Sequence, residues 1–204
     1  NYTKEEGKKA NIKIILEKKD KKFLIKDFAY TEGKSKILLK EIIIKKEKFI
    51  ESFKKININT FFKNYENNNF EIILGKKLLI NGTKFDSTNI IKEVKSQKKK
   101  NSFLKKINKD IEINIKKIVN NLNSEIKNFR LLGKLEKGKF IKISSKSDFF
   151  EGKHLDISLR KIQNSKLKTL EIYSDLTRPL LADFSFFKGL NGGNLLFTTT
   201  YDDI

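Results

Sequence analysis

The sequence predicts a mainly β protein: one long antiparallel sheet that is curled into a hydrophobic groove and carries two short helices. Apolar and polar residues alternate over most of the chain, and a period of two places alternate side chains on opposite faces of a strand. In KDIEINIKKI, Ile111, Ile113 and Ile115 share one face. Glu112 and Asn114 share the other face. Short polar connections between such runs favour antiparallel hairpins.

The same alternation recurs in KHLDISLRKI, where Leu155, Ile157 and Leu159 lie opposite Ser158. It also recurs in NIKIILEKK, FKKININT, FEIIL and GKFIKISS. Polar clusters at 67–69, 136–138 and 151–153 are typical of turns. The remaining residues that we expect to face inward are Ile12, Ile14, Leu16, Ile56, Ile58, Ile141 and Ile143.

An apolar sheet face must be covered by a second sheet, by helices or by something other than protein. Two short helices cannot cover so many strands. The pattern is therefore equally compatible with a closed sandwich or barrel core and with an open apolar groove.

Two segments break the period of two. FDSTNIIKEVKSQKKKN offers capping residues and then Ile90, Ile91 and Val94 at helical spacing, which predicts a helix over 87–97 and a lysine-rich linker after it. The segment around the only proline, Pro179, predicts a second helix over 177–188.

The second helix has an apolar stripe and a stop signal at Gly189, and the pair Gly192-Gly193 after it permits a tight turn into the next strand. We predict that both glycines adopt a conformation, or allow a close backbone approach, that a side chain would obstruct. The stripe is formed by Leu176, Leu180, Leu181, Phe184 and Phe187.

Composition restricts the protein class. The chain has 204 residues, 38% of them hydrophobic, no cysteine and no methionine, and we expect it to be part of a longer protein. No apolar run approaches the roughly 20 residues that a bilayer-spanning helix needs. The net charge of +20 suggests an anionic partner, but only three of the 45 basic residues are arginine. A basic nucleic-acid-binding domain is therefore the less favoured alternative, because phosphate and guanine contacts favour arginine.

Catalytic chemistry has few candidates in this chain. The single histidine, His154, lies on the polar face of its strand, and no glycine-rich phosphate loop is present. We expect no enzymatic activity, no catalytic residue, no cofactor and no metal site.

The order of motifs in the second part of the chain is a more specific signal than composition or alternation. A strand with a Gly-x-x-Phe-Asp stop, KKLLINGTKFDSTNIIKEV, precedes the hairpin DIEINIKKIVNNLNSEIKNFRLLGKLEKG. FIKISSKS, KHLDISLRK and KTLEIYSDLTRPLLADFSFFKGLNGGNLLF follow. This order resembles the AsmA-like C-terminal region of YhdP-type bacterial envelope proteins, in the AsmA/TamB-like lipid-transport superfamily. The motif residues that carry the resemblance are Ser174, Asp175, Leu180, Leu181, Gly189, Gly192 and Gly193.

The resemblance divides the chain into two parts. Residues 70–204 are similar to the AsmA-like groove region, whereas residues 1–69 match only by strand pattern and are expected to join the same sheet. Family members commonly carry Asp-Ala-Gly at the helix start, where this chain has Asp175-Leu176-Thr177. In the family this motif is structural.

The resemblance implies a periplasmic protein of a Gram-negative bacterium, anchored to the inner membrane by a segment outside this chain. Such proteins carry phospholipid between the inner and outer membranes through a hydrophobic groove and serve outer-membrane biogenesis. The partners would be phospholipid acyl chains, with membrane contact through other regions, and no nucleic acid. The alternative is an envelope scaffold or assembly module without lipid conduction, whose protein partners are unknown.

The groove that the resemblance implies and the alternation along the strands together predict which side chains contact lipid. We expect the helix over 177–188 to offer Leu180, Leu181, Phe184 and Phe187 to the apolar face. If the helix only covers a protein core, it is equally buried but touches no lipid. The expected lipid-lining residues are Ile111, Ile113, Ile115, Leu155, Ile157 and Leu159.

Overall fold

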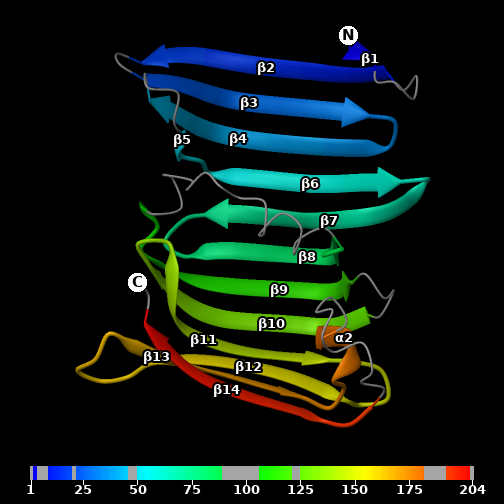
Figure 1. Ribbon diagram of the computed structural model, residues 1–204. Coiled ribbons are helices and arrows are strands. Elements are labelled where there is room, and N and C mark those ends of the chain that lie inside the picture. Colours follow the sequence, from blue (N-terminus) through cyan, green and yellow to red (C-terminus); the bar gives the residue numbers. More distant parts are fainter. Residues whose placement is uncertain are drawn as a thin grey trace.

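The computed structural model describes residues 2–3, 9–19, 22–45, 50–88, 106–120, 125–181 and 192–202. Their strands form one 14-stranded sheet in which each strand lies beside its neighbour in the chain, except that β6 pairs with β4 and the short β5 lies off this path (Figure 1). The strands are β1 (Tyr2–Thr3), β2 (Lys9–Lys19), β3 (Lys22–Glu32), β4 (Ser35–Lys45), β5 (Ile50–Ser52), β6 (Lys55–Phe62), β7 (Tyr65–Leu74), β8 (Leu78–Asp86), β9 (Lys109–Val119), β10 (Glu125–Glu136), β11 (Lys139–Asp148), β12 (His154–Lys161), β13 (Leu167–Ser174) and β14 (Leu195–Asp202).

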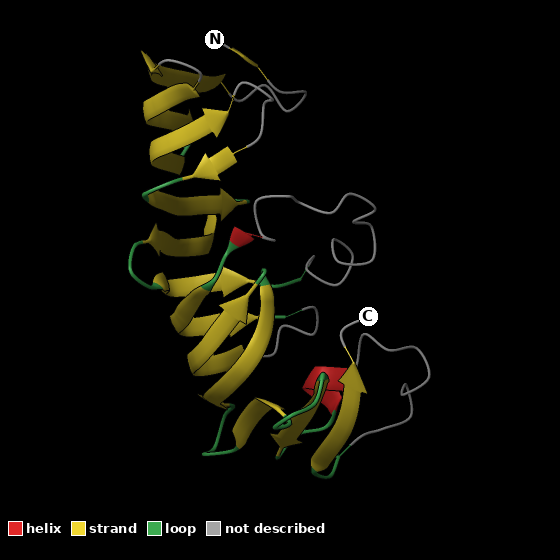
Figure 2. Ribbon diagram, turned by 90° about the vertical axis from the view of Figure 1, so that its left-hand side faces the viewer, coloured by secondary structure: helices red, strands yellow, loops and turns green. Residues whose placement is uncertain are grey.

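The prediction of a mainly β fold built on one open, curled sheet is confirmed. Seen along its edge, the sheet turns at its C-terminal end, so that β14 lies across from β10 and β11 (Figure 2). Strands from both predicted parts of the chain belong to this sheet. The predicted boundary between 1–69 and 70–204 falls inside β7.

The sheet is not antiparallel throughout, which corrects one part of the prediction. β8 and β9 pair in parallel, with Ile80 opposite Ile113, while every other described pair is antiparallel. A parallel neighbour requires the chain to return to the edge where the previous strand began, and this takes a dozen or more residues. The connection from Asp86 to Lys109 is long enough for that return.

The two predicted short helices are not found as such. The described residues contain one four-residue helical turn, α2 (Arg178–Leu181), in which the Leu181 N–H donates to the Thr177 carbonyl at 3.2 Å. Residues 182–188 of that predicted helix, and residues 89–97 of the other, lie outside the described residues, and residues 87 and 88 are not helical. No helix in the described part of the chain is long and apolar enough to cross a membrane.

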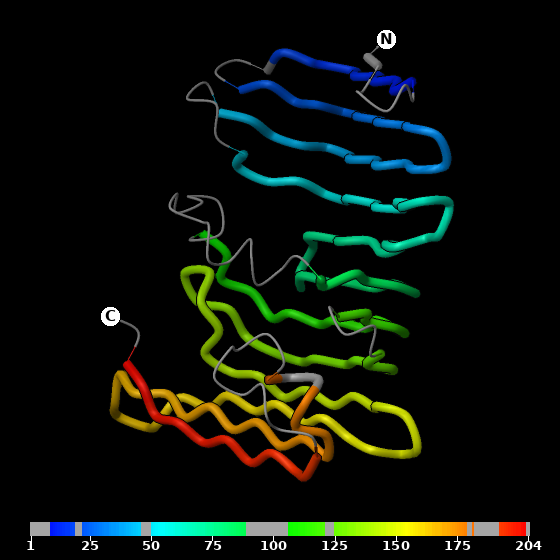
Figure 3. The backbone as a smooth tube through the Cα atoms, turned by 45° about the vertical axis from the view of Figure 1, so that its right-hand side comes forward, coloured from blue at the N-terminus to red at the C-terminus, as the bar shows by residue number. Residues whose placement is uncertain are grey.

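Bulges and tight turns account for the curvature. Register shifts interrupt the β2/β3, β6/β7, β7/β8 and β10/β11 pairs, and each extra residue bends its strand and increases the local twist. The hairpin turns at Lys63-Asn64 and Lys137-Gly138 have positive φ at both positions, the geometry that matches the twist of paired strands (Figure 3). The predicted turn at 67–69 is wrong, because these residues lie inside β7.

Candidate functional site

One face of the sheet carries an unbroken line of apolar side chains. Residues that pair directly across neighbouring strands lie on the same face of a sheet. Following these pairs from β2 to β14 gives a line that we call the apolar row, in which only Ser145 is polar. The apolar row consists of Ile14, Phe28, Leu39, Ile56, Ile72, Ile80, Ile113, Leu131, Ser145, Ile157, Ile172 and Phe197.

Further apolar residues flank this row on both sides. With about 4.8 Å between neighbouring strands, the apolar row runs for roughly 50 Å along the sheet. We call the whole surface, the apolar row with its flanking residues, the apolar face. The flanking residues are Ile12, Tyr30, Ile37, Ile58, Phe70, Ile115, Phe129 and Leu155 on one side, and Leu74, Leu78, Ile111, Ile143, Leu159 and Leu170 on the other.

The six residues predicted to line a groove all lie on this face. Ile113 and Ile157 belong to the apolar row itself, and the other four flank it. The period of two therefore grouped the side chains correctly within β9 and within β12, and the strand pairing shows that the two groups share one face. Their contact with lipid stays a prediction.

The apolar face is most deeply buried over β9 to β12 and is exposed at both ends. Leu155 and Leu159, in β12, are each 2% exposed. In β2, Ile14 is 47% and Leu16 is 61% exposed, and in β14 Phe197 is 45% exposed. The buried part adjoins the C-terminal curl of the sheet (Figure 2). Buried side chains of the described strands all lie on this face, which identifies it as the inner face of the curl.

Most of the predicted groove helix cannot be placed against this face. Leu181 ends α2 and is half-buried, and Leu180 precedes it in the same turn. Phe184, Phe187 and Gly189 lie outside the described residues. The contact of this helix with the apolar face therefore stays a prediction.

The Ser-Asp motif joins the end of β13 to the start of β12. Ser174 is fully buried, and its hydroxyl donates to the Leu176 carbonyl at 2.7 Å. Asp175 accepts the Tyr173 hydroxyl at 2.6 Å and the His154 N–H at 2.8 Å. The bond from the Tyr173 hydroxyl, and then the bond from the His154 N–H, hold the pKa of the Asp175 carboxyl below its ordinary value. Through these bonds the motif holds the end of β13 against the start of β12.

Gly193 completes the same corner. Its carbonyl accepts hydrogen bonds from the Thr177 N–H at 3.2 Å and from the Thr177 hydroxyl at 2.8 Å. Its φ is +85°, a backbone conformation that residues other than glycine rarely adopt. Gly192 has no such conformation, and a side chain there would meet no atom of the described residues, so the prediction that both glycines are required is wrong for Gly192.

We expect Gly193→Val to lower the free energy of unfolding by about 1 kcal/mol, because valine is strained at positive φ. Gly192→Val is the matched control and should leave stability unchanged, since no atom of the described residues lies within 4 Å of its Cβ position. Urea denaturation followed by circular dichroism measures both. Equal midpoints for the two variants would contradict this assignment.

Two other glycines matter more for the apolar face, and their role was not predicted. A Cβ atom on Gly82 would lie 2.4 Å from the Phe70 Cβ and 2.6 Å from the Asn69 carbonyl oxygen. On Gly133 it would lie 2.9 Å from the Lys142 carbonyl oxygen. The sequence signal was a glycine inside an alternating strand, which often marks a bulge or a close backbone approach.

Polar groups on the apolar face are mostly bound to backbone. The Ser147 hydroxyl donates to the Leu155 carbonyl at 3.1 Å, and the buried Lys168 Nζ donates to the Phe140 carbonyl at 2.6 Å. The buried Ser145 hydroxyl has no hydrogen-bond partner among the described residues.

Residues with catalytic or metal-binding chemistry do not converge in the described part of the chain. His154 is exposed, with Nδ1 3.2 Å from an Asp148 carboxylate oxygen, which makes it a surface pair. No cluster of three or more histidine, cysteine or acidic side chains that could hold a metal occurs among the described residues. The feature available for binding on this side of the sheet is the apolar face.

The fold and this face define a class: a single-sheet β protein with a continuous apolar face that is exposed at both ends. Comparison with protein-family models, with curated proteins and with solved structures finds no match to this chain.

Proposed function

We propose that this chain is a segment of an AsmA-like envelope protein that carries phospholipid between the inner and outer membranes, with acyl chains lying on the apolar face. In this proposal the chain is periplasmic and is anchored to the inner membrane by a segment outside it. The succession of strand, Ser174-Asp175, helical turn, Gly192-Gly193 and strand supports the AsmA-like assignment.

The continuity of the apolar row carries this proposal. The row crosses the sheet from β2 to β14, and the described residues include no second sheet that could cover it. Exposing such a surface to water is unfavourable, and burying an acyl chain against it contributes about 0.8 kcal/mol for each methylene group. An extended, one-dimensional apolar path suits a chain-like ligand better than a compact one.

The charge distribution fits the same ligand. The chain has a net charge of +20, and most lysines of the described residues lie in turns or on the face opposite the apolar row. A basic surface attracts anionic lipid headgroups, with about 1 kcal/mol for each lysine near a membrane surface. Acyl chains on the apolar face and headgroups near lysines would thus be accommodated together.

A scaffold module is the second candidate, and the burial of Leu155 and Leu159 favours it at β12. If the apolar face is a closed protein core there, other protein segments cover the exposed ends around Ile14 and Phe197. The two functions therefore differ in what touches the apolar row: lipid in one, protein in the other.

Photo-crosslinking in cells distinguishes them. We expect a photoreactive amino acid at Ile113 or Ile157 to capture phospholipid, detected by mass spectrometry of the purified chain. The same probe at Asn114 or Ser158, one residue away on the opposite face, should capture none. Protein adducts without lipid at both inward positions would replace the lipid proposal by the scaffold.

A further inference from the structure

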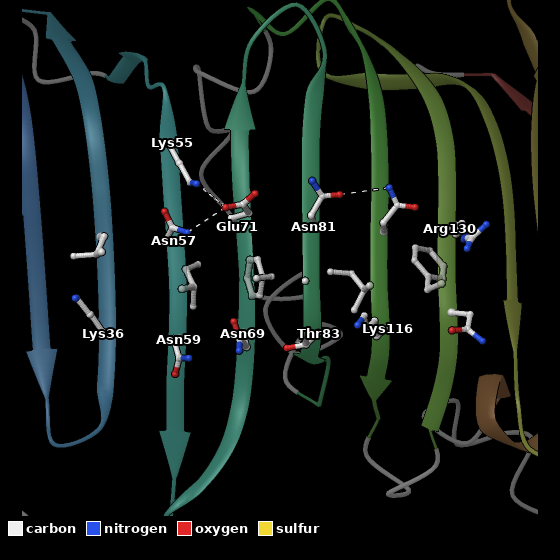
Figure 4. A pocket seen from close by; sticks show the side chains of 18 of the residues that line it. Lys36, Lys55, Asn57, Asn59, Asn69, Glu71, Asn81, Thr83, Lys116 and Arg130 are labelled. Atoms are coloured by element: carbon white, nitrogen blue, oxygen red, sulfur yellow. Dashed lines mark hydrogen bonds and ion pairs between the residues drawn. The ribbon is translucent and has the colours of Figure 1, made fainter.

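The face opposite the apolar face is hollowed over β4 and β6 to β10 (Figure 4). The depression has a volume of about 1100 Å³. Directly paired residues form its central row, so their side chains point into the same space. We call this depression the polar trough. Its central row is Asn57, Glu71, Asn81, Asn114 and Arg130.

The polar trough carries excess positive charge. Its one carboxylate, Glu71, lies 2.7 Å from the Lys55 Nζ, and this hydrogen bond lowers the pKa of Glu71. Lys55 and Glu71 therefore neutralise each other. Four further cations line the trough without an ion pair among the described residues: Lys36, Lys40, Lys116 and Arg130.

The floor of the trough is made of amides. The Asn57 Nδ2 donates to Glu71 at 3.3 Å, and the Asn114 Nδ2 donates to the Asn81 Oδ1 at 3.4 Å. The Asn114 Nδ2 also donates to the Glu112 Oε1 at 3.2 Å. Among the described residues, the Asn57 and Asn114 side-chain oxygens accept no hydrogen bond, the Asn81 Nδ2 donates none, and the buried Asn59 Oδ1 has no partner. An amide donates and accepts at once, as a hydroxyl group does. Such a floor suits a ligand rich in hydroxyl groups.

We propose that the polar trough binds an acidic oligosaccharide. Its hydroxyl groups would bond to Asn57, Asn81 and Asn114, and its carboxylates would pair with the unpaired cations, chiefly Lys116 and Arg130. The amide row crosses several strands, so the ligand lies across them in an extended form.

Single-stranded nucleic acid fits the same charge less well. Binding of unpaired bases depends on aromatic side chains on which the bases stack. Phe70 and Phe129 border the trough, but their pairing places their side chains on the apolar face. The Phe70 ring packs edge-to-face on the Phe85 ring, with 5.4 Å between the ring centroids. The trough face has amides in the places where stacking residues would be needed.

Isothermal titration calorimetry with an oligogalacturonate, a carboxylated oligosaccharide, tests the proposal. We expect saturable binding, and much weaker binding of a neutral malto-oligosaccharide of equal length. Lys116→Gln and Arg130→Gln should each lower the affinity about tenfold, the loss expected for one charge-assisted hydrogen bond. Asn81→Ala should weaken binding without changing the charge.

Lys142→Gln is the matched control, since it removes the same charge from β11, outside the residues that line the trough. Its affinity should equal that of the unchanged chain. The proposal is overturned if the oligogalacturonate does not bind, or if Lys142→Gln weakens binding as much as Lys116→Gln. Single-stranded DNA of equal charge that binds as tightly would also overturn it, because general attraction to a chain of +20 would then suffice.

Discussion

Replacing Gly82 by alanine is expected to destabilise the sheet by about 3 kcal/mol, the upper end of the cost of overpacking. The added methyl group would lie 2.4 Å from the Phe70 Cβ and 2.6 Å from the Asn69 carbonyl oxygen. Both contacts involve atoms next to or in the backbone of β7, which cannot rotate away as the end of a long side chain can. β7 and β8 must separate to admit the group.

The control for this variant is Gly75→Ala, because the nearest atom to its Cβ position is the Lys77 carbonyl oxygen at 3.9 Å. Its effect should stay within about 0.5 kcal/mol, as for other surface changes. Urea denaturation midpoints followed by far-ultraviolet circular dichroism compare the two variants. A Gly82→Ala midpoint equal to that of Gly75→Ala would show that β7 does not approach β8 as closely as described.

Which residues of β7 come close to Gly82 could not be predicted from the sequence. Alternation predicts which side chains of a strand share a face, because successive side chains point to opposite faces. From this pattern alone, Ile113 and Ile157 were predicted to lie on the apolar face. What lies beside Gly82 depends instead on the register shift of the β7/β8 pair, where Asn69 pairs with Lys84 and Phe70 pairs with Gly82, so that Thr83 is the extra residue in β8. A glycine inside an alternating strand is a signal of close approach, but it does not identify the neighbouring residue that comes close.

Two other differences have the same origin. The asparagines at 67–69 have high turn propensity, but they lie in β7, where their polar side chains bond to neighbours such as Thr60 and Glu66. The hairpin turn lies instead at Lys63-Asn64. The parallel pairing of β8 with β9 likewise depends on the path of the connecting segment, which alternation within strands does not report.

The polar trough was not predicted for a related reason. Asn114 was placed on the polar face of its strand, where a solvated side chain is the ordinary expectation. Only the pairing of five strands brings Asn57, Asn81 and Asn114 into one row and sets Lys116 and Arg130 beside them. Which side chains lie together on a sheet face depends on the register between strands, and the sequence of a single strand does not report that register.

The lipid proposal predicts its largest effect for Ile113→Glu. Ile113 is half-buried in the middle of the apolar row, and a carboxylate there would lie among acyl chains, where an unpaired charge is costly. We expect the amount of phospholipid that copurifies with the chain, measured by mass spectrometry, to fall at least tenfold. Asn114→Asp adds the same charge one residue away on the opposite face and should leave the lipid unchanged.

Loss of folding must be separated from loss of binding. Ile14→Glu provides this separation, because Ile14 lies in the same apolar row but is 47% exposed, so its carboxylate keeps much of its water and the melting temperature should change little. If the row is one continuous lipid path, Ile14→Glu also lowers the bound phospholipid. A folded Ile14→Glu variant with undiminished lipid, together with an Ile113→Glu variant that unfolds, would identify the buried middle of the apolar face as a protein core.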